Sequence, residues 1–262
     1  MKIWWHHAIP YREVYQTYDE ILRRHTDRLS DNGKVMEVNH YWNEKGSGAL
    51  QYHSLDLMNK AQCVEAMCKA EESGYDAGVI GCSMDVGVDE SKEAVNIPIV
   101  GLAEAGMICA CLLGKSFSEI TFGKKLKTRI EERAAEIGLE NKLASVRVIE
   151  MELEEAGEAL TNPKYTQQLK ELFMGESKKA AEEDGAEVII PGCGLLCAMC
   201  IRDRIGKIEG TQVPVMDGVI AALGLAVTSI KFKDEAGVTV SRAGIFASPP
   251  AELLQEARKY YR

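Results

Sequence analysis

Two cysteines occupy matching places in two similar stretches of this sequence. Residues 71–82 and 182–193 align without a gap, and the stretches end at Cys82 and Cys193. Each reads as a helix end, a glycine, a short apolar strand and then Gly-Cys, which predicts a thiol at the carboxyl-terminal tip of each strand. Two thiols that face each other across a substrate carbon can remove a proton from one face and return one to the other.

The residues around the two thiols suit proton transfer. Backbone N–H groups at a helix N-terminus lower the pKa of a cysteine and can hold a carboxylate or an enolate-like oxygen. Gly81 and Gly192 allow the backbone to approach closely. Ser83 and Gly194 follow the cysteines, and Ser83 adds a hydroxyl donor. Asp85 is placed to hydrogen-bond the first loop or to cap the following helix.

The similarity of the halves continues beyond the cysteines. A short helix leads to residues 96–101 (NIPIVG) in the first half and 212–218 (QVPVMDG) in the second. Any two βαβ units share a general pattern, but an ungapped match that ends twice in Gly-Cys, with Pro and Gly matched downstream, favours a duplicated unit. We therefore predict two similar halves that each present one thiol.

The composition excludes several classes of protein. The chain has 262 residues, of which 46% are hydrophobic, and a formal net charge of −9, which argues against a nucleic-acid partner. Neither a secretory signal nor a run approaching the ~18 apolar residues of a membrane span is visible, so we expect a cytoplasmic protein without a membrane partner. Its eight cysteines are too few for a disulfide scaffold and are expected to be reduced.

Strands alternate with helices along most of the chain. Strands are predicted at residues 2–6, 34–39, 77–80, 97–101, 117–122, 144–150, 188–190, 213–216 and 228–230, and helices at 11–29, 55–73, 89–95, 104–113, 124–137, 166–183 and 252–262. This alternation predicts an α/β fold of two pseudo-symmetric lobes, each a mainly parallel sheet flanked by helices, with the active site at the lobe interface. Residues 1–114 and about 222–262 are assigned to lobe 1, with Cys82, and residues 115–221 to lobe 2, with Cys193.

Residues 74–105 resemble the Asp/Glu/hydantoin racemase superfamily, and most closely its hydantoin racemase branch. That branch has a similar Gly-Cys-Phe-Gly-Asp-Pro-Gly segment followed by Pro-Val-Val-Gly and Glu-Ala; this chain has GCSMDVG at 81–87, PIVG at 98–101 and Glu104-Ala105. The second half is similar over 184–222, so the resemblance covers most of the chain. It implies two α/β lobes with an interfacial site, no cofactor, and Cys82 and Cys193 as the acid/base pair.

The chain departs from that branch in three places where the substrate is selected. The first strand of the branch ends in Asn-Pro-Asn, but residues 6–10 here are HHAIP. Ser83-Met84 replaces Phe-Gly after the first cysteine, and residues 46–53 match none of the better known members. His6 or His7 is a candidate contact for a substrate carboxylate, with a structural role at the strand end as the alternative.

Cys193, Cys197 and Cys200 form a C-x₃-C-x₂-C pattern, which is the spacing of a radical-SAM iron–sulfur site. That motif normally precedes most of a barrel, whereas here the chain ends soon after it. A structural zinc ion requires a fourth ligand, and no nearby His or second C-x-x-C supplies one. Because neither a pyridoxal-phosphate lysine nor a G-x-G-x-x-G pattern is evident either, we expect no cofactor and no metal.

We therefore predict a cofactor-independent racemase or epimerase that exchanges protons alpha to a carbonyl through Cys82 and Cys193. The substrate is expected to be a small carboxylate or cyclic ureide, held by His7, Tyr52, Ser83, Met84, Gly194 and Leu195. A cis–trans isomerase or lyase-type member of the same superfamily is one alternative, because a thiol can add to a double bond. A non-catalytic small-ligand-binding protein is the other. We also expect a homo-oligomer.

Overall fold

The computed structural model describes residues 1–151 and 153–260. The chain divides into two compact units. Unit 1 comprises Met1–Tyr11, Thr26–Leu102 and Ala222–Arg262, and unit 2 comprises Arg12–His25 and Ala103–Ala221. Each cysteine of the repeated Gly-Cys pair therefore belongs to a different unit.

Unit 1 contains a four-stranded sheet and three of the helices that accompany it. Its elements are β1 (Lys2–Pro10), β2 (Glu37–Asn43), α2 (His53–Glu72), β3 (Ala77–Ile80), α3 (Val88–Ala94), β4 (Ile99–Gly101) and α10 (Ala251–Arg258). Helices α1 (Gln16–Leu29), α4 (Leu102–Leu113) and α9 (Gly218–Ala236) contribute residues to both units.

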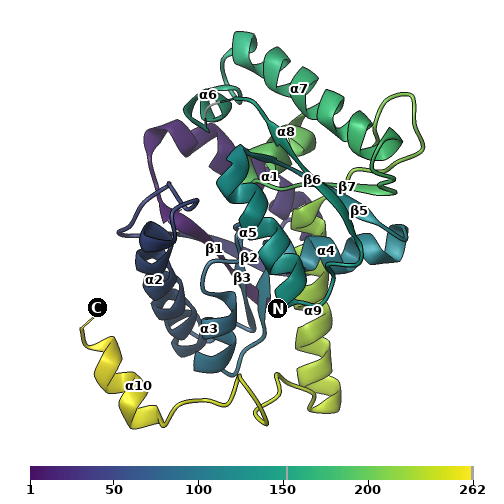
Figure 1. The fold of residues 1–262 in the computed structure, drawn as a ribbon. Coiled ribbons are helices and arrows are strands. Elements are labelled where there is room, and N and C mark those ends of the chain that lie inside the picture. Colours follow the sequence, from purple (N-terminus) through teal and green to yellow (C-terminus); the bar gives the residue numbers. More distant parts are fainter. Residues whose placement is uncertain (152, 261–262) are drawn as a thin grey trace. The chain divides into compact units, whose positions relative to one another are not determined.

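The sheet of unit 1 is parallel throughout, with the strand order β2-β1-β3-β4. The chain moves outward from β1 to β2 and then returns to the other side of β1 to form β3. Because crossover connections are right-handed, this reversal makes the gap between β1 and β3 a topological switch point, where parallel sheets bind ligands. Helix α2 packs against β1, β2 and β3 (Figure 1).

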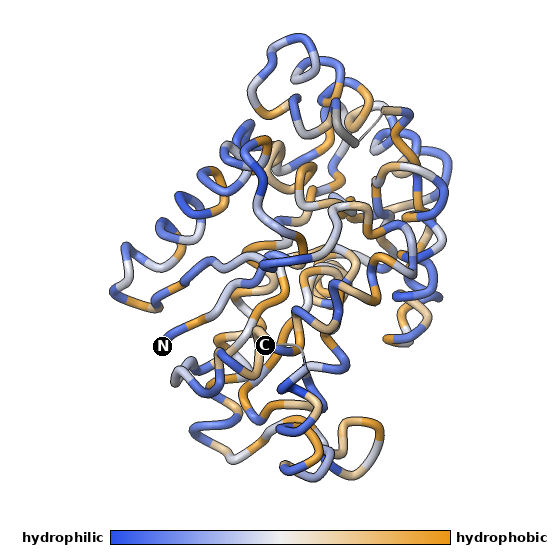
Figure 2. The backbone as a smooth tube through the Cα atoms, turned by 90° about the vertical axis from the view of Figure 1, so that its left-hand side faces the viewer, coloured by the Kyte–Doolittle hydropathy of each residue, from blue (hydrophilic) through white to orange (hydrophobic). Residues whose placement is uncertain are grey.

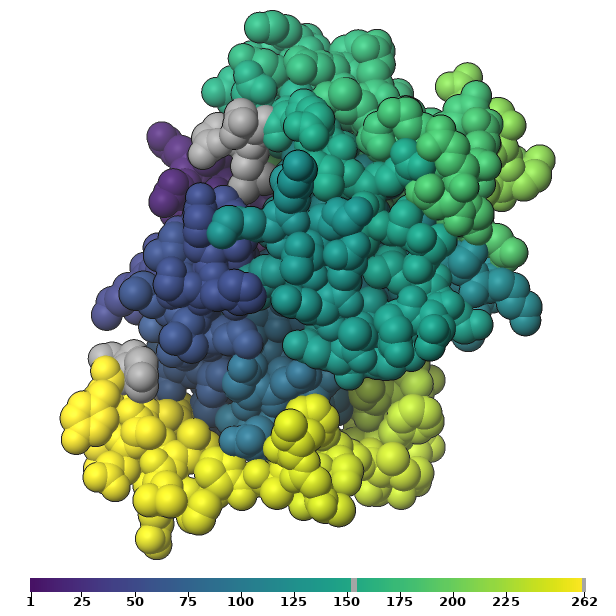
Figure 3. Space-filling view, in the orientation of Figure 1, coloured from purple at the N-terminus to yellow at the C-terminus, as the bar shows by residue number. Residues whose placement is uncertain are grey.

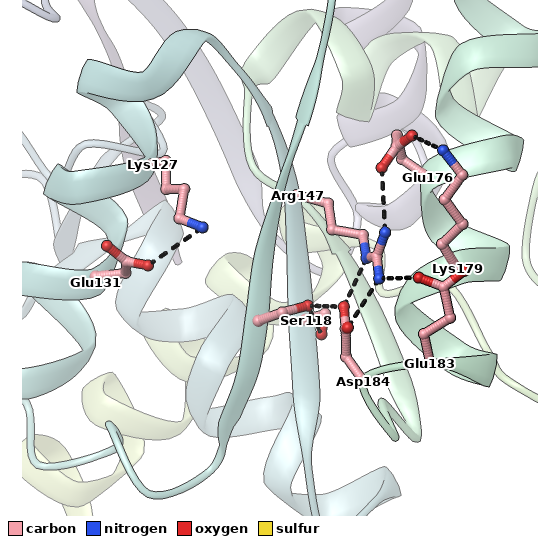
Figure 4. Close-up of polar contacts among 9 residues, drawn as sticks. Ser118, Lys127, Glu131, Arg147, Glu176, Lys179, Glu183 and Asp184 are labelled. Atoms are coloured by element: carbon pink, nitrogen blue, oxygen red, sulfur yellow. Dashed lines mark hydrogen bonds and ion pairs between the residues drawn. The ribbon is translucent and has the colours of Figure 1, made fainter.

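Unit 2 has a three-stranded parallel sheet with the order β6-β5-β7. Its elements are the 3₁₀ turn η1 (Glu13–Tyr15), β5 (Phe117–Phe122), α5 (Gly123–Glu136), β6 (Leu143–Ile149), α6 (Leu153–Glu158), α7 (Pro163–Glu182), β7 (Val188–Pro191) and α8 (Gly194–Asp203). Helices α5 and α7 both pack on β5 and β6, and Figure 4 shows them on opposite faces of these strands. The helices present alternating hydrophobic and hydrophilic stretches, as expected for helices that cover a sheet with one face (Figure 2).

Two backbone hydrogen bonds of the first sheet recur at corresponding positions of the second. Gly81 N–H donates to His6 O at 2.9 Å, and Gly192 N–H donates to Ile120 O at 2.8 Å. Beyond the third strand, Gly78 N–H donates to Pro98 O and Ile189 N–H to Pro214 O, both at 2.9 Å. Gly81 and Gly192, Gly78 and Ile189, and Pro98 and Pro214 are pairs of equivalent residues in the sequence alignment. The duplication therefore extends to the strand registers.

Most predicted elements are present, and β3 and β5 have the predicted bounds. The strand predicted at 228–230 is wrong, because these residues lie inside α9. The strand predicted at 213–216 is reduced to isolated bridges, one of which pairs Val215 with Ile189. The second strand lies three to four residues later than predicted, because 31–33 turn with positive φ angles at Asp31, Asn32 and Gly33. The C-terminal helix ends at Arg258, and residues 261–262 of its predicted range lie outside the described residues.

The C-terminal segment lies along the surface of unit 1, where Figure 3 shows it in yellow. Arg242 donates to Lys92 O at 2.8 Å and to the carbonyls of Glu93 and Val95, so it caps the last carbonyls of α3. Arg258 of α10 pairs with Glu65 and Glu72 of α2, each at 2.6 Å. Arg242 and Arg258 thus attach this segment to α3 and α2, the helices that follow and precede β3 in the chain.

Candidate active site

Cys82 lies in a tight turn directly after β3. Its own N–H donates to Ile80 O at 2.9 Å, and Asp85 N–H donates to Cys82 O at 3.0 Å. Asp85 has a φ of 46°, and Gly87, at 75°, is the N-cap of α3. The predicted place of Cys82 at the strand tip is therefore present, but Gly87 rather than Asp85 precedes the helix.

Each glycine of the two Gly-Cys pairs makes room for a large side chain from the central strand of its sheet. A Cβ on Gly81 would lie 2.3 Å from Trp5 Nε1, and a Cβ on Gly192 would lie 2.9 Å from Glu119 Oε2. Trp5 and Glu119 occupy equivalent positions in β1 and β5, and their side chains are almost completely buried. The glycines are therefore required by packing, because any larger residue would displace the strand tip.

Cys193 is the N-cap of α8 and makes no side-chain capping hydrogen bond there, but the backbone N–H groups of Leu195 and Leu196 at the start of the helix act on the pKa of its thiol. These donors lower the pKa of the thiol, but burial raises it by more. The net effect is a raised pKa, which differs from the lowered value expected from the sequence. The reason is that desolvation outweighs two neutral donors at this place. Cys193 is consequently a protonated thiol at neutral pH, and it lies at the N-terminus of α8.

Unit 2 places further polar groups near this helix end. A Cβ on Gly194 would lie 2.9 Å from Tyr18 Oη, so the phenol lies beside the start of α8. Asp217 accepts from the N–H groups of Val219 and Ile220 through one oxygen and contacts His25 Nε2 at 2.8 Å through the other. Sequence reasoning missed this His25–Asp217 pair, because 192 residues separate the two side chains.

The predicted substrate-binding residues differ in exposure. Ser83 is buried, Met84 is half-buried, and Met84 packs with Cys82 against the apolar cluster of unit 1. In unit 2, Gly194 is half-buried and Leu195 is buried. Both sets of residues therefore adjoin their cysteine.

His7 and Tyr52 have different surroundings. His7 is buried, contacts His40 Nδ1 at 3.2 Å and stacks on Trp42 with 4.0 Å between ring centroids. This environment supports the structural alternative for that histidine. Tyr52 is the N-cap of α2 and is exposed.

Sequence reasoning also missed a buried amide network at the end of β1 in unit 1. Asn43 of β2 and Asn59 of α2 both donate to the Ala8 carbonyl, at 2.8 and 2.7 Å. Asn43 Oδ1 contacts His6 Nε2 at 2.8 Å. Burial lowers the pKa of His6 to about 4, so its imidazole is neutral at neutral pH. The one sequence signal that pointed to this network was the departure of residues 6–10 from the family pattern.

The remaining thiols show no sign of a metal site. Cys197 donates to Pro191 O at 3.4 Å, and burial raises the pKa of both Cys197 and Cys200. Among the described residues, the three thiols of C-x₃-C-x₂-C are not close enough together to share one ion. All eight cysteines lie in the described ranges, and no disulfide joins any of them there. Within the same ranges, no helix has the length and apolar character needed to span a membrane.

Comparison with known proteins agrees with this fold. The family model for Asp/Glu/Hydantoin racemase matches residues 13–226. The hydantoin racemase of Pseudomonas sp. (strain NS671) is 30% identical over 71% of this chain and 70% of its own length, and that of Rhizobium meliloti is 32% identical over 69% of each chain. The crystal structure of an allantoin racemase from Pseudomonas fluorescens superimposes with a TM-score of 0.76 at 25% identity, covering 95% of this chain and 97% of that one. The chain belongs to the Asp/Glu/hydantoin racemase family.

Proposed function

We propose that this chain is a cofactor-independent racemase in which Cys82 and Cys193 exchange protons on opposite faces of a carbon alpha to a carbonyl. One cysteine, as the thiolate, removes the α-hydrogen, and the other, as the thiol, donates its proton to the opposite face. The intermediate carries its charge on the carbonyl oxygen, where backbone N–H groups stabilise it. Reversal of the two roles converts the other enantiomer.

One observation carries this proposal. The two Gly-Cys tips end equivalent strands, and the hydrogen bonds Gly81–His6 and Gly192–Ile120 repeat in the same register. In both units the glycine before the cysteine is fitted against a large buried side chain, so the strand tip that carries each thiol is held in the same way. The raised pKa of Cys193 supports the thiol form, and hence the proton-donating role, for this residue in the resting enzyme.

We further propose a cyclic ureide of the hydantoin class as the substrate. Two relatives that are 30% and 32% identical to this chain are named hydantoin racemases, and the solved structure at 25% identity is an allantoin racemase. The groups that adjoin the cysteines in each unit are compatible with a neutral ring: apolar Met84 in one and backbone N–H groups in the other. A panel of hydantoins and free amino acids, followed by chiral chromatography, tests this assignment.

The central test uses Cys82→Ser and Cys193→Ser in D₂O. Each substitution should slow racemisation by at least about a thousandfold, because it removes one acid/base group. Each variant should still exchange the α-hydrogen of one enantiomer, and the two variants should differ in which enantiomer exchanges. Cys111→Ser, at a half-buried thiol of α4, is the matched control and should racemise at the wild-type rate.

Full racemisation by either active-site variant would rule out the two-thiol mechanism. A cis–trans isomerase or lyase would turn over an unsaturated or carboxylated substrate without deuterium entering at the α-carbon of either hydantoin enantiomer. A ligand-binding protein would bind the hydantoin with no exchange at all.

A further inference from the structure

The carbonyl oxygen of Ala8 accepts hydrogen bonds from two buried side-chain amides. Asn43 Nδ2 lies at 2.8 Å and Asn59 Nδ2 at 2.7 Å, and these residues are 3% and 0% exposed. Burying a primary amide costs free energy unless its donors and acceptors find partners. Two such groups directed at one backbone carbonyl therefore fix that part of the chain with unusual stringency.

The Asn59 side chain also hydrogen-bonds the loop after β2. Asn59 Oδ1 accepts from Ser47 N–H at 2.9 Å, and Asn59 Nδ2 also donates to Ser47 O at 2.7 Å. A Cβ on Gly46 would lie 2.3 Å from Asn59 Oδ1, so this loop position requires glycine. Asn59 therefore ties the loop after β2 to the end of β1.

Asn43 is oriented by a histidine whose tautomer follows from its neighbours. Trp4 Nε1 donates to His6 Nδ1 at 3.3 Å, which leaves the proton of the neutral ring on Nε2. That N–H donates to Asn43 Oδ1 at 2.8 Å, and the Asn43 amide then donates to Ala8 O. The pKa of His6, lowered to about 4 by burial, keeps this direction of donation at neutral pH.

The fixed segment and Cys82 adjoin the same apolar cluster. β1 and β3 are parallel, and their pairing ends with His6 opposite Ile80, two residues before Ala8 and Cys82 respectively. Ala8 belongs to the apolar cluster of unit 1, and both Ile9 and Cys82 pack against that cluster. This is also the switch point between β1 and β3.

We propose that Asn43 and Asn59 are positioning residues that fix the Ala8 backbone as the wall beside the Cys82 thiol, with His6 orienting Asn43. The amides do not touch substrate, because they are buried behind the wall. They act by holding the distance between Cys82 and the α-carbon, where a displacement of about 1 Å costs on the order of a hundredfold in rate. The inference rests on the proposed proton-transfer role of Cys82.

The test compares Asn43→Ser with Asn39→Ser, which removes an asparagine from the same strand whose amide donates to the exposed Glu37, at 3.0 Å. Both variants and the wild type are assayed with α-protiated and α-deuterated hydantoin in each direction. Asn43→Ser should lower kcat/KM by tenfold or more and raise the primary isotope effect only in the direction in which Cys82 removes the proton. Asn39→Ser should leave the isotope effects and kcat/KM unchanged.

A merely structural role for Asn43 would reduce the amount of active enzyme and leave both isotope effects at their wild-type values, which would overturn the inference. If Asn43→Ser does not fold, His6→Gln and His6→Leu replace it. Gln retains an N–H that can reach Asn43, so His6→Gln should preserve the wild-type isotope effects and His6→Leu should shift the one for Cys82. Equal behaviour of these two variants would also overturn the inference.

The wild-type assay separates this inference from the proposed function. If the wild type racemises no hydantoin and exchanges no α-hydrogen, the proposed function fails and the inference fails with it. If the wild type racemises and Cys82→Ser does not, the function stands, and the isotope effects of Asn43→Ser decide the inference alone.

Discussion

Cys82 and Cys193 end equivalent strands, but each unit surrounds its thiol with different groups. In unit 1 the carboxylate of Asp85 lies against Gly101, where an added Cβ would come within 2.3 Å of Asp85 Oδ1. Continued without a gap, the match of residues 71–82 with 182–193 places Leu196 at the position of Asp85. Aligning Pro98 with Pro214 places Asp217 at the position of Gly101, with Gly218 one residue later. Each unit therefore has one carboxylate at this position. In unit 1 it is Asp85, from the turn after the cysteine, and in unit 2 it is Asp217, at the position equivalent to Gly101 itself.

The raised pKa of Cys193 gives a prediction for its reactivity. The rate of alkylation of this thiol by iodoacetamide, followed by peptide mass spectrometry from pH 7 to 10.5, should have its midpoint above the ordinary value of about 8.5. The physical reason is that burial disfavours the thiolate more than the N–H groups of Leu195 and Leu196 favour it. Glutathione in the same reaction is the reference thiol. A midpoint below that of glutathione would mean that the helix end dominates over burial.

At the scale of elements, β6 and α7 are joined by a charged cluster that fixes the chain before β7. Arg147 donates to both oxygens of Asp184, at 2.6 and 2.8 Å, and to Glu183 at 2.7 Å, while Ser145 donates to Asp184 at 2.6 Å (Figure 4). The hydrogen bonds from Arg147 lower the pKa of Asp184. Because β7 carries Cys193 at its tip, this cluster contributes to the register of the strand.

Arg147→Ala should lower the free energy of unfolding by about 2 kcal/mol, since it removes several charge-assisted hydrogen bonds from a half-buried carboxylate. Lys127→Ala is the control, because Lys127 and Glu131 form an exposed pair at 3.8 Å and should contribute less than about 0.5 kcal/mol. Urea unfolding at several pH values measures both effects. Asp184 has a lowered pKa in the folded state, so its contribution is present above about pH 4 and is lost as the pH falls through the folded-state pKa. A deficit in Arg147→Ala that does not shrink in acid would contradict this assignment.

At the scale of the whole molecule, the chain extends beyond the part that the family model matches. That match ends at residue 226, and the segment after α9 lies on unit 1 through Arg242 and Arg258. Arg242 caps α3, the helix that follows the Cys82 turn, and Arg258 holds α2, the helix that carries Asn59. The C-terminal segment thus supports both helices next to the proposed Cys82 half of the site.

Arg242→Ala should increase hydrogen–deuterium exchange at the amides of α3 by about tenfold, because the last carbonyls of that helix lose their cap. Exchange in α5 and α7 of unit 2 should not change. Arg24→Ala, at an exposed arginine paired within its own helix, is the matched control and should leave the exchange in α3 unaltered. Unchanged protection of α3 in Arg242→Ala would show that the segment is not a support.

Local patterns were sufficient for some elements and not for others. β3 and β5 were predicted with their observed bounds, because β3 is a short apolar run after a glycine turn and β5 is a short run rich in aromatic and β-branched residues. Residues 228–230 were misread as a strand, since β-branched residues there outweighed a helical pattern that is apolar on most sides and extends through all of α9. The delayed start of β2 depends on the turn at 31–33, which propensity alone does not place.

The sequence by itself determined the family, through the resemblance of its two Gly-Cys segments. It also determined the parallel α/β class and the placement of a cysteine after each matched strand, because these follow from periodicity and from residues close together in the chain. Only the tertiary structure decided that burial raises the pKa of Cys193 despite its helix end. It also decided that His7 stacks on Trp42, that His25 meets Asp217, and that Asn43 and Asn59 converge on Ala8. The physical reason is that desolvation and side-chain convergence depend on segments distant in sequence, and no local pattern encodes which buried polar group will meet which.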